Sequence, residues 1–532
     1  MTITRRSALL SGTALAVSTA LPESVGAQQQ PRRGGILTVH MAQEQRILNP
    51  ALRASTGVYV IASKIMEPLA DLDQEGRPVP MLATSWEGTA DGKTITVKLR
   101  EGVTWHDGKP FTSADVQHTA MEMWKKHLNY GTTLHQFLDA VDTPDATTAI
   151  FRYSRPMPMD LFIRSMPDLG YIAPKHVYQG TNPLENPANT APIGTGPFKF
   201  VQYERGQYVI ADRNPNYWRQ GLPYLDRIVW RFITDKAAAT AALESGQVLM
   251  SNYSSIPIAD LDRLKKDPRF EVSTRGNEGQ PFHNTIEFNH RRKELADVRV
   301  RRAIIHAIDT NFFAENFLYG FGKRGTGPIP TTSKAFYTPG APDYPFDRKK
   351  AEALLDEAGY KRGPDGTRFS VRIVPAPWGE DVPLWATFMQ QSLAPVGIKG
   401  EIINYDAAGY LSKVYRDNEF DISTGWHIYR ADPAISTMVW YHSGSPKGTA
   451  FTNQWGWASK EIDTMIDEAA FEIDPAKRQA RYPEIVKALN TEAPIWMAIE
   501  REFASVTSKR LQNHHNNPRW PSSHWADAWL AS

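Results

Sequence analysis

Aromatic side chains suited to contacting a small ligand gather between residues 426 and 457. The group comprises Trp426, Tyr429, Trp440, Tyr441, Phe451, Trp455 and Trp457, with Arg430 and Asp432 between them. Gly-, Ser- and Pro-containing segments surround the group, so we expect several members on loops. Loop-borne Trp and Tyr beside an Arg can stack on a ligand and hydrogen-bond it. For Trp426, Tyr429 and Trp455 the sequence leaves ligand contact and core packing equally open.

The catalytic and nucleotide-binding motifs that we searched for are either absent from this chain or lack the structural context that they need. Residues 320–325 match the letters of a dinucleotide fingerprint, but a predicted helix precedes them and prolines follow, whereas the fingerprint needs a strand before it and a helix after it. Residues 92–94 lack the earlier glycine of a phosphate loop, and the HExxH, EF-hand and GxSxG motifs do not occur. Abundant carboxylates do not exclude a glycosidase pair. A secreted carbohydrate-active enzyme therefore stays as an alternative.

Cysteine is absent from the sequence, which excludes disulfides, thiol nucleophiles and Cys-ligated metals. His514, His515 and His524 could form a metal site, because imidazole is a common ligand. Adjacent residues on an extended tail point in opposite directions, however, and no carboxylate has ligand spacing. The sequence favours a polar tail and predicts neither a metal site nor a cofactor, and a metal-chelate binder that uses histidines is a further alternative.

Length and charge set the broad class. A chain of 532 residues is too long for one core, so we expect two or three domains. Lys and Arg number 60 against 58 Asp and Glu, a formal net charge of +2. That balance argues against a nucleic-acid partner, since general nucleic-acid binders carry a strong basic excess.

The first 27 residues have the features of a cleaved export signal. Arg5 and Arg6 precede a mild apolar run that is too short to span a bilayer, and residues 25–27 are of the kind that a signal peptidase recognises. The arginine pair favours the twin-arginine route over an ordinary Sec signal. No later stretch approaches 18 consecutive apolar residues, so we predict a mature protein that diffuses in the periplasm.

Strand and helix patterns alternate irregularly along the body of the chain. Strands are predicted at residues 95–99, 198–201, 228–233, 285–289 and 495–499. Helices are predicted at residues 113–124, 236–243, 298–318, 348–358 and 460–469. Thr112 and Asp115 form a capping-box pattern before the first of these helices, and Asp347 and Ser459 are predicted caps of the last two.

Several ordered segments together resemble a known family. They are Glu67-Pro68-Leu69 and the stretches 100–108 (REGVTWHDG), 194–198 (GTGPF), 214–218 (NPNYW), 288–289, 298–309 and 353–360 (ALLDEAGY). In this order and spacing the chain is similar to the extracellular solute-binding proteins of ABC importers, in the branch of dipeptide-, oligopeptide- and nickel-binding proteins. The similarity covers essentially the whole chain after residue 27.

The resemblance implies an α/β fold of two lobes, a type II periplasmic binding protein of the large class with an extra inserted subdomain. Lobe I would comprise residues 28–60, 191–284 and 496–532, the inserted subdomain residues 61–190, and lobe II residues 285–495. The chain would cross the hinge twice, near residues 285–289 and 495–501.

The resemblance also implies how such a clamp works. A solute that contacts both lobes favours the closed state through its differential contacts there. The closed form docks on the transmembrane subunits of an ABC permease, whose ATPase subunits supply the work. The expected protein is a monomer that binds a small solute without transforming it.

One departure from the family pattern bears on the solute. In peptide-binding members an Asp three residues after the Trp of the Gly-Trp segment pairs with the peptide α-amino group. Here that position is Tyr429, which is neutral at pH 7, and a buried ammonium without a counter-charge is costly. We therefore predict a solute other than a peptide with a free amino terminus, although a peptide held by other contacts stays as an alternative. Arg430 favours an anionic solute or is a solvated loop side chain.

Further ligand contacts are assigned by position alone. Thr56 and Tyr59 lie at the start of the first predicted helix, and His283 lies beside the first hinge crossing. With Trp426, Tyr429, Arg430 and Trp455 they complete the predicted ligand-binding set.

Overall fold

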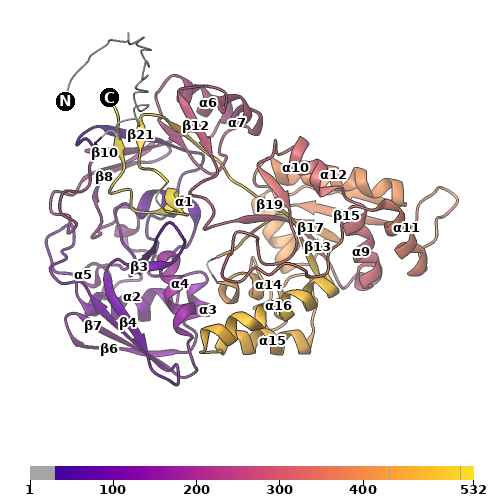
Figure 1. The fold of residues 1–532 in the computed structure, drawn as a ribbon, viewed down its shortest axis with the longest axis horizontal. Helices are drawn as coiled ribbons and strands as arrows, with labels where there is room; N and C mark the ends of the chain where they lie inside the picture. Colours follow the sequence, from indigo (N-terminus) through magenta and orange to yellow (C-terminus); the bar gives the residue numbers. More distant parts are fainter. Residues whose placement is uncertain (1–29, 431, 516) are drawn as a thin grey trace, which may run out of the picture.

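The protein has two lobes, each built around its own large β-sheet (Figure 1). The structure is a computed structural model that describes residues 30–430, 432–515 and 517–532, and the predicted signal segment lies outside the described residues. Within the described residues, no helix has both the length and the apolar character needed to span a membrane.

A seven-stranded sheet forms the centre of lobe I. In spatial order its strands are β12 (Phe270–Ser273), β20 (Ser505–Ser508), β11 (Met250–Ser251), β1 (Ile36–Met41), β10 (Arg227–Phe232), β9 (Tyr208–Arg213) and β8 (Phe198–Glu204). β1 pairs in parallel with β10 and β11, and β20 returns from near the C-terminus to pair antiparallel with β11 and β12. Its helices are α1 (Thr56–Ala62), α6 (Lys236–Glu244) and α7 (Ile258–Leu264). Lobe I therefore draws its strands from both ends of the chain and from a middle segment.

A four-stranded antiparallel unit packs on lobe I and shares its hydrophobic core. Its strands are β4 (Ala83–Gly88), β5 (Thr94–Leu99), β7 (Thr148–Tyr153) and β6 (Leu138–Asp145), accompanied by the hairpin β2 (Ala70–Leu72) and β3 (Pro78–Pro80). Its helices are α2 (Ser113–Thr119), α3 (Gly131–Leu134), α4 (Met159–Leu169) and α5 (Lys175–Tyr178). Ile95, Val97 and Leu99 are buried on one face of β5, which confirms the predicted strand.

The predicted start of α2 is confirmed as well. A carboxylate oxygen of Asp115 accepts a hydrogen bond from the Thr112 backbone N–H at 2.9 Å, as expected of a capping box.

The second large sheet forms the centre of lobe II. Its order is β14 (Gly322–Arg324), β19 (Ile495–Arg501), β13 (Phe282–Phe288), β17 (Ile422–Thr424), β15 (Phe369–Pro375) and β16 (Ile398–Ile402), with β18 (Trp426–Ile428) also paired to β13. The helices are α8 (Lys293–Ala296), α9 (Val298–His306), α10 (Thr310–Asn316), α11 (Arg348–Glu357), α12 (Asp381–Leu393), α13 (Ala407–Tyr410), α14 (Thr437–Tyr441), α15 (Lys460–Phe471) and α16 (Pro475–Glu492). Asp347 and Ser459 cap α11 and α15 as predicted.

One predicted helix is wrong. The segment 298–318 forms two helices, because α9 ends at His306 and Asp309 then caps α10. The Asp309 carboxylate accepts a hydrogen bond from the Phe312 backbone N–H at 3.0 Å. A mid-segment Asp that captures a backbone donor starts a new helix more readily than it continues an old one.

The chain passes between the two large sheets in two places. Residues 274–281 lead from β12 to β13, and residues 502–504 lead from β19 back to β20. β13 and β19 are antiparallel neighbours within lobe II, so the two passages lie side by side. The exact division of the chain into segments at residues 285 and 495 stays a prediction.

Three of the family-like motifs, at residues 67–69, 194–198 and 214–218, converge on one buried carboxyl group in lobe I, that of Glu67. Its oxygens accept hydrogen bonds from the Tyr217 hydroxyl at 2.7 Å, the Thr195 hydroxyl at 2.8 Å and the Trp218 indole N–H at 3.0 Å. Gly194 belongs to the same junction, because a Cβ there would lie 1.7 Å from the Ile65 carbonyl oxygen. These motifs therefore hold the lobe together and lie outside the space between the lobes.

Burial raises the pKa of Glu67 to about 7, against the lowering effect of these three hydrogen bonds. A carboxyl whose pKa is higher in the folded than in the unfolded chain stabilises the fold most at low pH, and this contribution is lost as pH rises through the folded pKa. We expect native protein to lose stability relative to Glu67→Gln between pH 5 and pH 7, by up to about 1.4 kcal/mol per pH unit. Urea midpoints of both proteins across this range measure the difference, and parallel pH profiles would contradict the account.

Candidate functional site

A cleft of about 660 Å³ lies between the lobes. Lobe I and its four-stranded unit contribute the β2–β3 hairpin, Arg164 of α4, five residues of the first passage and three of the tail. The passage residues are Arg275, Gly276, Glu278, Gly279 and Pro281, and the tail residues are His515, Asn517 and Pro518. Lobe II contributes residues 332–335 and Tyr429. Because both lobes line this space, a solute inside it can contact both at once, which is the requirement for ligand-driven closure.

The lobes meet beside the cleft around the carboxylate of Asp168, in the last turn of α4. Arg519 of the C-terminal tail lies 2.7 Å from one carboxylate oxygen, and the Gln280 side chain donates to the same oxygen at 2.8 Å. Arg430 of lobe II approaches the other oxygen at 3.7 Å. All three charged side chains are at most 4 % exposed. A buried carboxylate thus joins both lobes, the first passage and the tail.

Arg430 is inserted deeply into lobe I. It donates to the Ala54 carbonyl at 3.3 Å, and its guanidinium lies 4.7 Å from the centre of the Tyr130 ring. Burial lowers the pKa of Arg430, but the Asp168 carboxylate together with Tyr130 and Tyr59 outweighs that effect and leaves the pKa above its ordinary value. Arg430 is therefore a charged anchor between the lobes and not a solvated loop side chain.

A second ion pair crosses between the lobes through Arg478 of α16. The guanidinium makes two 2.7 Å contacts with Asp432 and one 3.0 Å contact with Asp160 at the start of α4. Asp432 is fully buried and paired with Arg478, so its role is structural. The rings of Phe137 and Phe471 meet close by, with centres 5.8 Å apart. The structure is thus a closed arrangement of the lobes.

Among the described residues that line the cleft, Tyr429 is the one member of the predicted ligand-binding set. Its side chain is 3 % exposed, and its hydroxyl lies 2.8 Å from the Ser333 hydroxyl. Burial raises the pKa of this phenol well above its ordinary value, so the position carries no negative charge.

Trp426 and Trp455 lie within lobe II. The Trp426 indole N–H donates to Asp381 at 3.0 Å, and its ring packs edge-on against Phe503. Trp455 is fully buried, with its ring centre 5.4 Å from that of Trp440. In this closed arrangement packing accounts for both indoles, and ligand contact by either residue stays a prediction.

The other predicted contacts lie next to the meeting point of the lobes. Thr56 begins α1, and Tyr59 is fully buried with its hydroxyl donating to the Asp168 carbonyl at 2.5 Å. His283 on β13 is fully buried beside His427, and burial lowers its pKa to about 3. Neither ring nitrogen of His283 has a hydrogen-bond partner among the described residues.

Three cationic side chains that line the cleft were not predicted from the sequence, namely Arg164, Arg275 and Lys334. None has a carboxylate within ion-pair distance among the described residues, whereas the fourth cleft cation, Arg77, is paired with Asp73. They come from α4, from the first passage and from lobe II, so no spacing along the chain connects them. The cleft therefore offers unpaired positive charge from both lobes.

Comparison with known proteins identifies the family. The model of bacterial extracellular solute-binding proteins, family 5 (middle part), matches residues 77–449. The chain belongs to this family. A putative ABC transporter peptide-binding protein of Brucella ovis is 31% identical over 481 residues, 86% of each chain. A glutathione-binding protein of Pectobacterium atrosepticum is 27% identical over 86% of this chain and 87% of its own length.

Solved structures of the same fold hold different ligands. NikZ from Campylobacter jejuni, in complex with Ni(L-His), superposes with a TM-score of 0.78 at 22% identity over 91% of this chain and 96% of its own. AgaA from A. tumefaciens R10, in complex with agropinic acid, gives 0.76 at 24% identity over 94% and 99%. The family 5 protein thus has the predicted two-lobed fold and is the solute-binding component of an ABC importer, working with permease and ATPase subunits, while its solute is a separate question.

Removing the Arg430 anchor should favour the open arrangement of this family 5 protein. In Arg430→Ala the Asp168 carboxylate keeps Arg519, so lobe I should stay folded while lobe II loses a buried contact worth up to about 3–5 kcal/mol. Small-angle X-ray scattering should report a larger radius of gyration than for native protein.

Lys236→Ala is the matched control for this variant. Its ion pair with Glu380 also crosses between the lobes, at 2.7 Å, but both side chains are more than a third exposed, and such pairs contribute little. Equal radii for native protein and Arg430→Ala would contradict the anchoring role.

Proposed function

We propose that this protein captures a small anionic solute, carrying a carboxylate or a comparable group, in the cleft between its lobes and presents it to an ABC permease. The observation that carries the proposal is the set of three cleft cations without a carboxylate partner, Arg164, Arg275 and Lys334. Their charges come from both lobes, so an anion between them would gain more in the closed than in the open state.

Arg164 is the strongest single candidate for direct contact. It is half-buried, while Arg275 and Lys334 are exposed, and a guanidinium can bind a carboxylate through two parallel hydrogen bonds. Partial burial also reduces the screening of its charge by water. We therefore assign Arg164 as the principal anion-binding side chain.

The amine end of a peptide has no evident partner in this cleft. Tyr429 occupies the position of the family's amine-pairing Asp and is hydrogen-bonded to Ser333. The two cleft carboxylates are already engaged, since Glu75 pairs with Arg77 and Glu278 accepts from the Gly276 backbone N–H. The proposed solute accordingly lacks a free α-amino terminus.

We further propose where the protein acts, in which oligomeric state, and that it does not transform its solute. The protein acts in the periplasm as a monomer and leaves its solute unchanged. Support comes from the family, whose described members are extracellular binding proteins, and from the predicted signal at residues 1–27. AgaA, a structure of the same fold, holds agropinic acid, so this fold accommodates an acid.

Calorimetry with a panel of sugar acids, dicarboxylates and amino-terminally blocked or free dipeptides tests the proposal. Native protein should bind members of the acid class and not the free dipeptides. Arg164→Ala should weaken acid binding about 10–100-fold, the effect of losing a charged hydrogen bond. Tyr429→Asp should weaken acid binding too and improve binding of free dipeptides.

Arg77→Ala is the matched control, because Arg77 lines the same cleft but is already paired with Asp73 and Glu75. Its effect on acid binding should be small. Tight binding of free dipeptides by native protein, with no acid bound, would refute the proposed solute class.

A further inference from the structure

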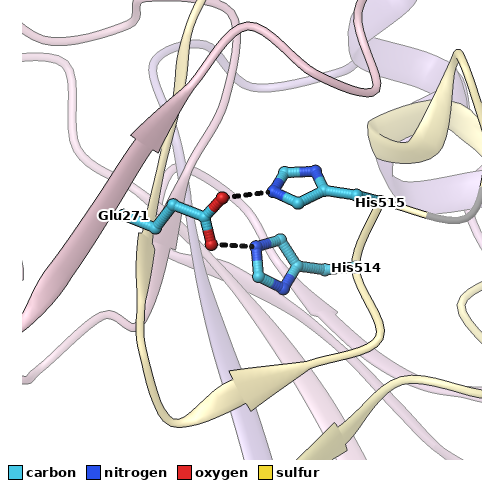
Figure 2. Close-up of side chains that lie close together, drawn as sticks. All are labelled: Glu271, His514 and His515. Carbon is cyan, nitrogen blue, oxygen red and sulfur yellow. Dashed lines mark hydrogen bonds and ion pairs between the residues drawn. The ribbon is translucent and has the colours of Figure 1, made fainter.

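Glu271, His514 and His515 come together on lobe I, outside the ion pairs that join the lobes (Figure 2). Oε1 of Glu271 lies 2.8 Å from Nε2 of His515, and Oε2 lies 3.3 Å from Nε2 of His514. The two imidazole centres are 4.0 Å apart. Both histidines thus face one carboxylate, so the expectation that these neighbours point apart is wrong, as is the grouping with His524, which contacts Arg219 instead.

Long-range strand pairing produces this arrangement. Glu271 lies on β12 and is in register with Thr507 of β20. After β20 the chain forms β21 (Leu511–Gln512), and Asn513 then adopts a φ of 58°. This left-handed conformation is uncommon for residues other than glycine, and Asn tolerates it best. It redirects the chain so that the two histidines turn back toward β12.

We propose that Glu271, His514 and His515 form a binding site for a divalent transition-metal ion of the zinc, nickel and copper class. Two imidazoles and one carboxylate are a donor set suited to these ions, whereas calcium and magnesium prefer oxygen ligands alone. The inference does not depend on the proposed solute, since all three side chains belong to lobe I.

The distances suit an ion after a small adjustment. Ligand atoms about 2.1 Å from a tetrahedral zinc ion are roughly 3.4 Å from one another. Oε2 of Glu271 and Nε2 of His514, 3.3 Å apart, already match this spacing, and one ligand atom from each of the three residues lies within 4.8 Å of the others, so the side chains must draw together around one ion. Nδ1 of each histidine has no hydrogen-bond partner among the described residues. Each ring can therefore carry its proton on Nδ1 and offer Nε2 to the metal.

The site is also accessible from solvent. All three side chains line a surface pocket of about 470 Å³, and His515 and Arg275 line both this pocket and the cleft between the lobes. An ion held by three protein ligands keeps a fourth position for water or for a donor atom of a bound molecule. The site thus lies at the mouth of the cleft, next to the first passage between lobes.

Metal titration of untagged, chelator-treated protein tests this inference. We expect one equivalent of Zn²⁺ or Ni²⁺ to bind, measured by competition with a chromophoric chelator, and to raise the melting temperature. His515→Ala, which removes a half-buried side chain, and Glu271→Gln should each weaken binding by at least about 10-fold, and His514→Ala/His515→Ala by about 100-fold or more.

Two control variants show whether a loss of metal affinity is specific to the three proposed ligands. His176→Ala removes a histidine that pairs with a single carboxylate, Asp107, at 2.7 Å, and it should leave metal affinity unchanged. Arg164→Ala should also leave it unchanged, which separates this site from the anion cleft. Native protein that binds neither metal, or His515→Ala and Glu271→Gln variants that bind as tightly as native protein, would overturn the inference. In either case the three side chains would only tether the tail to β12.

Discussion

The carboxylate of Asp168 is buried where both lobes, the first passage between them and the C-terminal tail come together. A buried charge of this kind is tolerated only when partners of opposite charge and good hydrogen bonds surround it. Arg519 and Gln280 belong to the lobe I side of this junction and can stay in place when the lobes move. Arg430 belongs to lobe II, so full compensation of Asp168 requires closure. The same carboxylate therefore stabilises lobe I by itself and stabilises the closed arrangement through Arg430.

This constraint separates the machinery of closure from the recognition of the solute. Arg430, Arg478 and their carboxylate partners neutralise one another beside the cleft. Arg164 and Lys334, within the cleft, have no such partner among the described residues. A solute that brings negative charge to them would add its own contacts between the lobes to those ion pairs. If the solute binds the closed state a few kcal/mol more tightly than the open state, this difference is enough to invert the populations of the two states.

The sequence predicts the fold far better than it predicts the site. Local patterns such as the alternation in 95–99 and the caps at Thr112 and Asp347 depend on neighbours within a few residues, so they are visible along the chain. Three of the motifs that carry the family resemblance meet at Glu67 inside lobe I, away from the cleft, so they identify the fold and leave the solute open. One local pattern gave a wrong prediction: the apolar periodicity of 298–318 continues past Asp309, so a single helix was expected where Asp309 caps a second one.

Site residues depend on contacts between distant segments, and no spacing encodes those. Arg164 and Lys334 are 170 positions apart in the numbering, and each looks like an ordinary surface cation in the sequence. Glu271 meets His514 only because β12 and β20 are paired. Aromatic density drew attention to Trp455, but that density mostly reflects a core in lobe II. Tyr429 was found because the family pattern names its position, and the structure places it in the cleft.

Identification of the small molecules that accompany the protein through purification tests the central claim most directly. Protein purified without refolding is denatured, and the released compounds are analysed by mass spectrometry beside those released from Arg164→Ala. The account predicts an acidic solute without a free α-amino terminus, held by native protein and depleted in the variant. Peptides with free amino termini, released in equal amounts from both proteins, would contradict it.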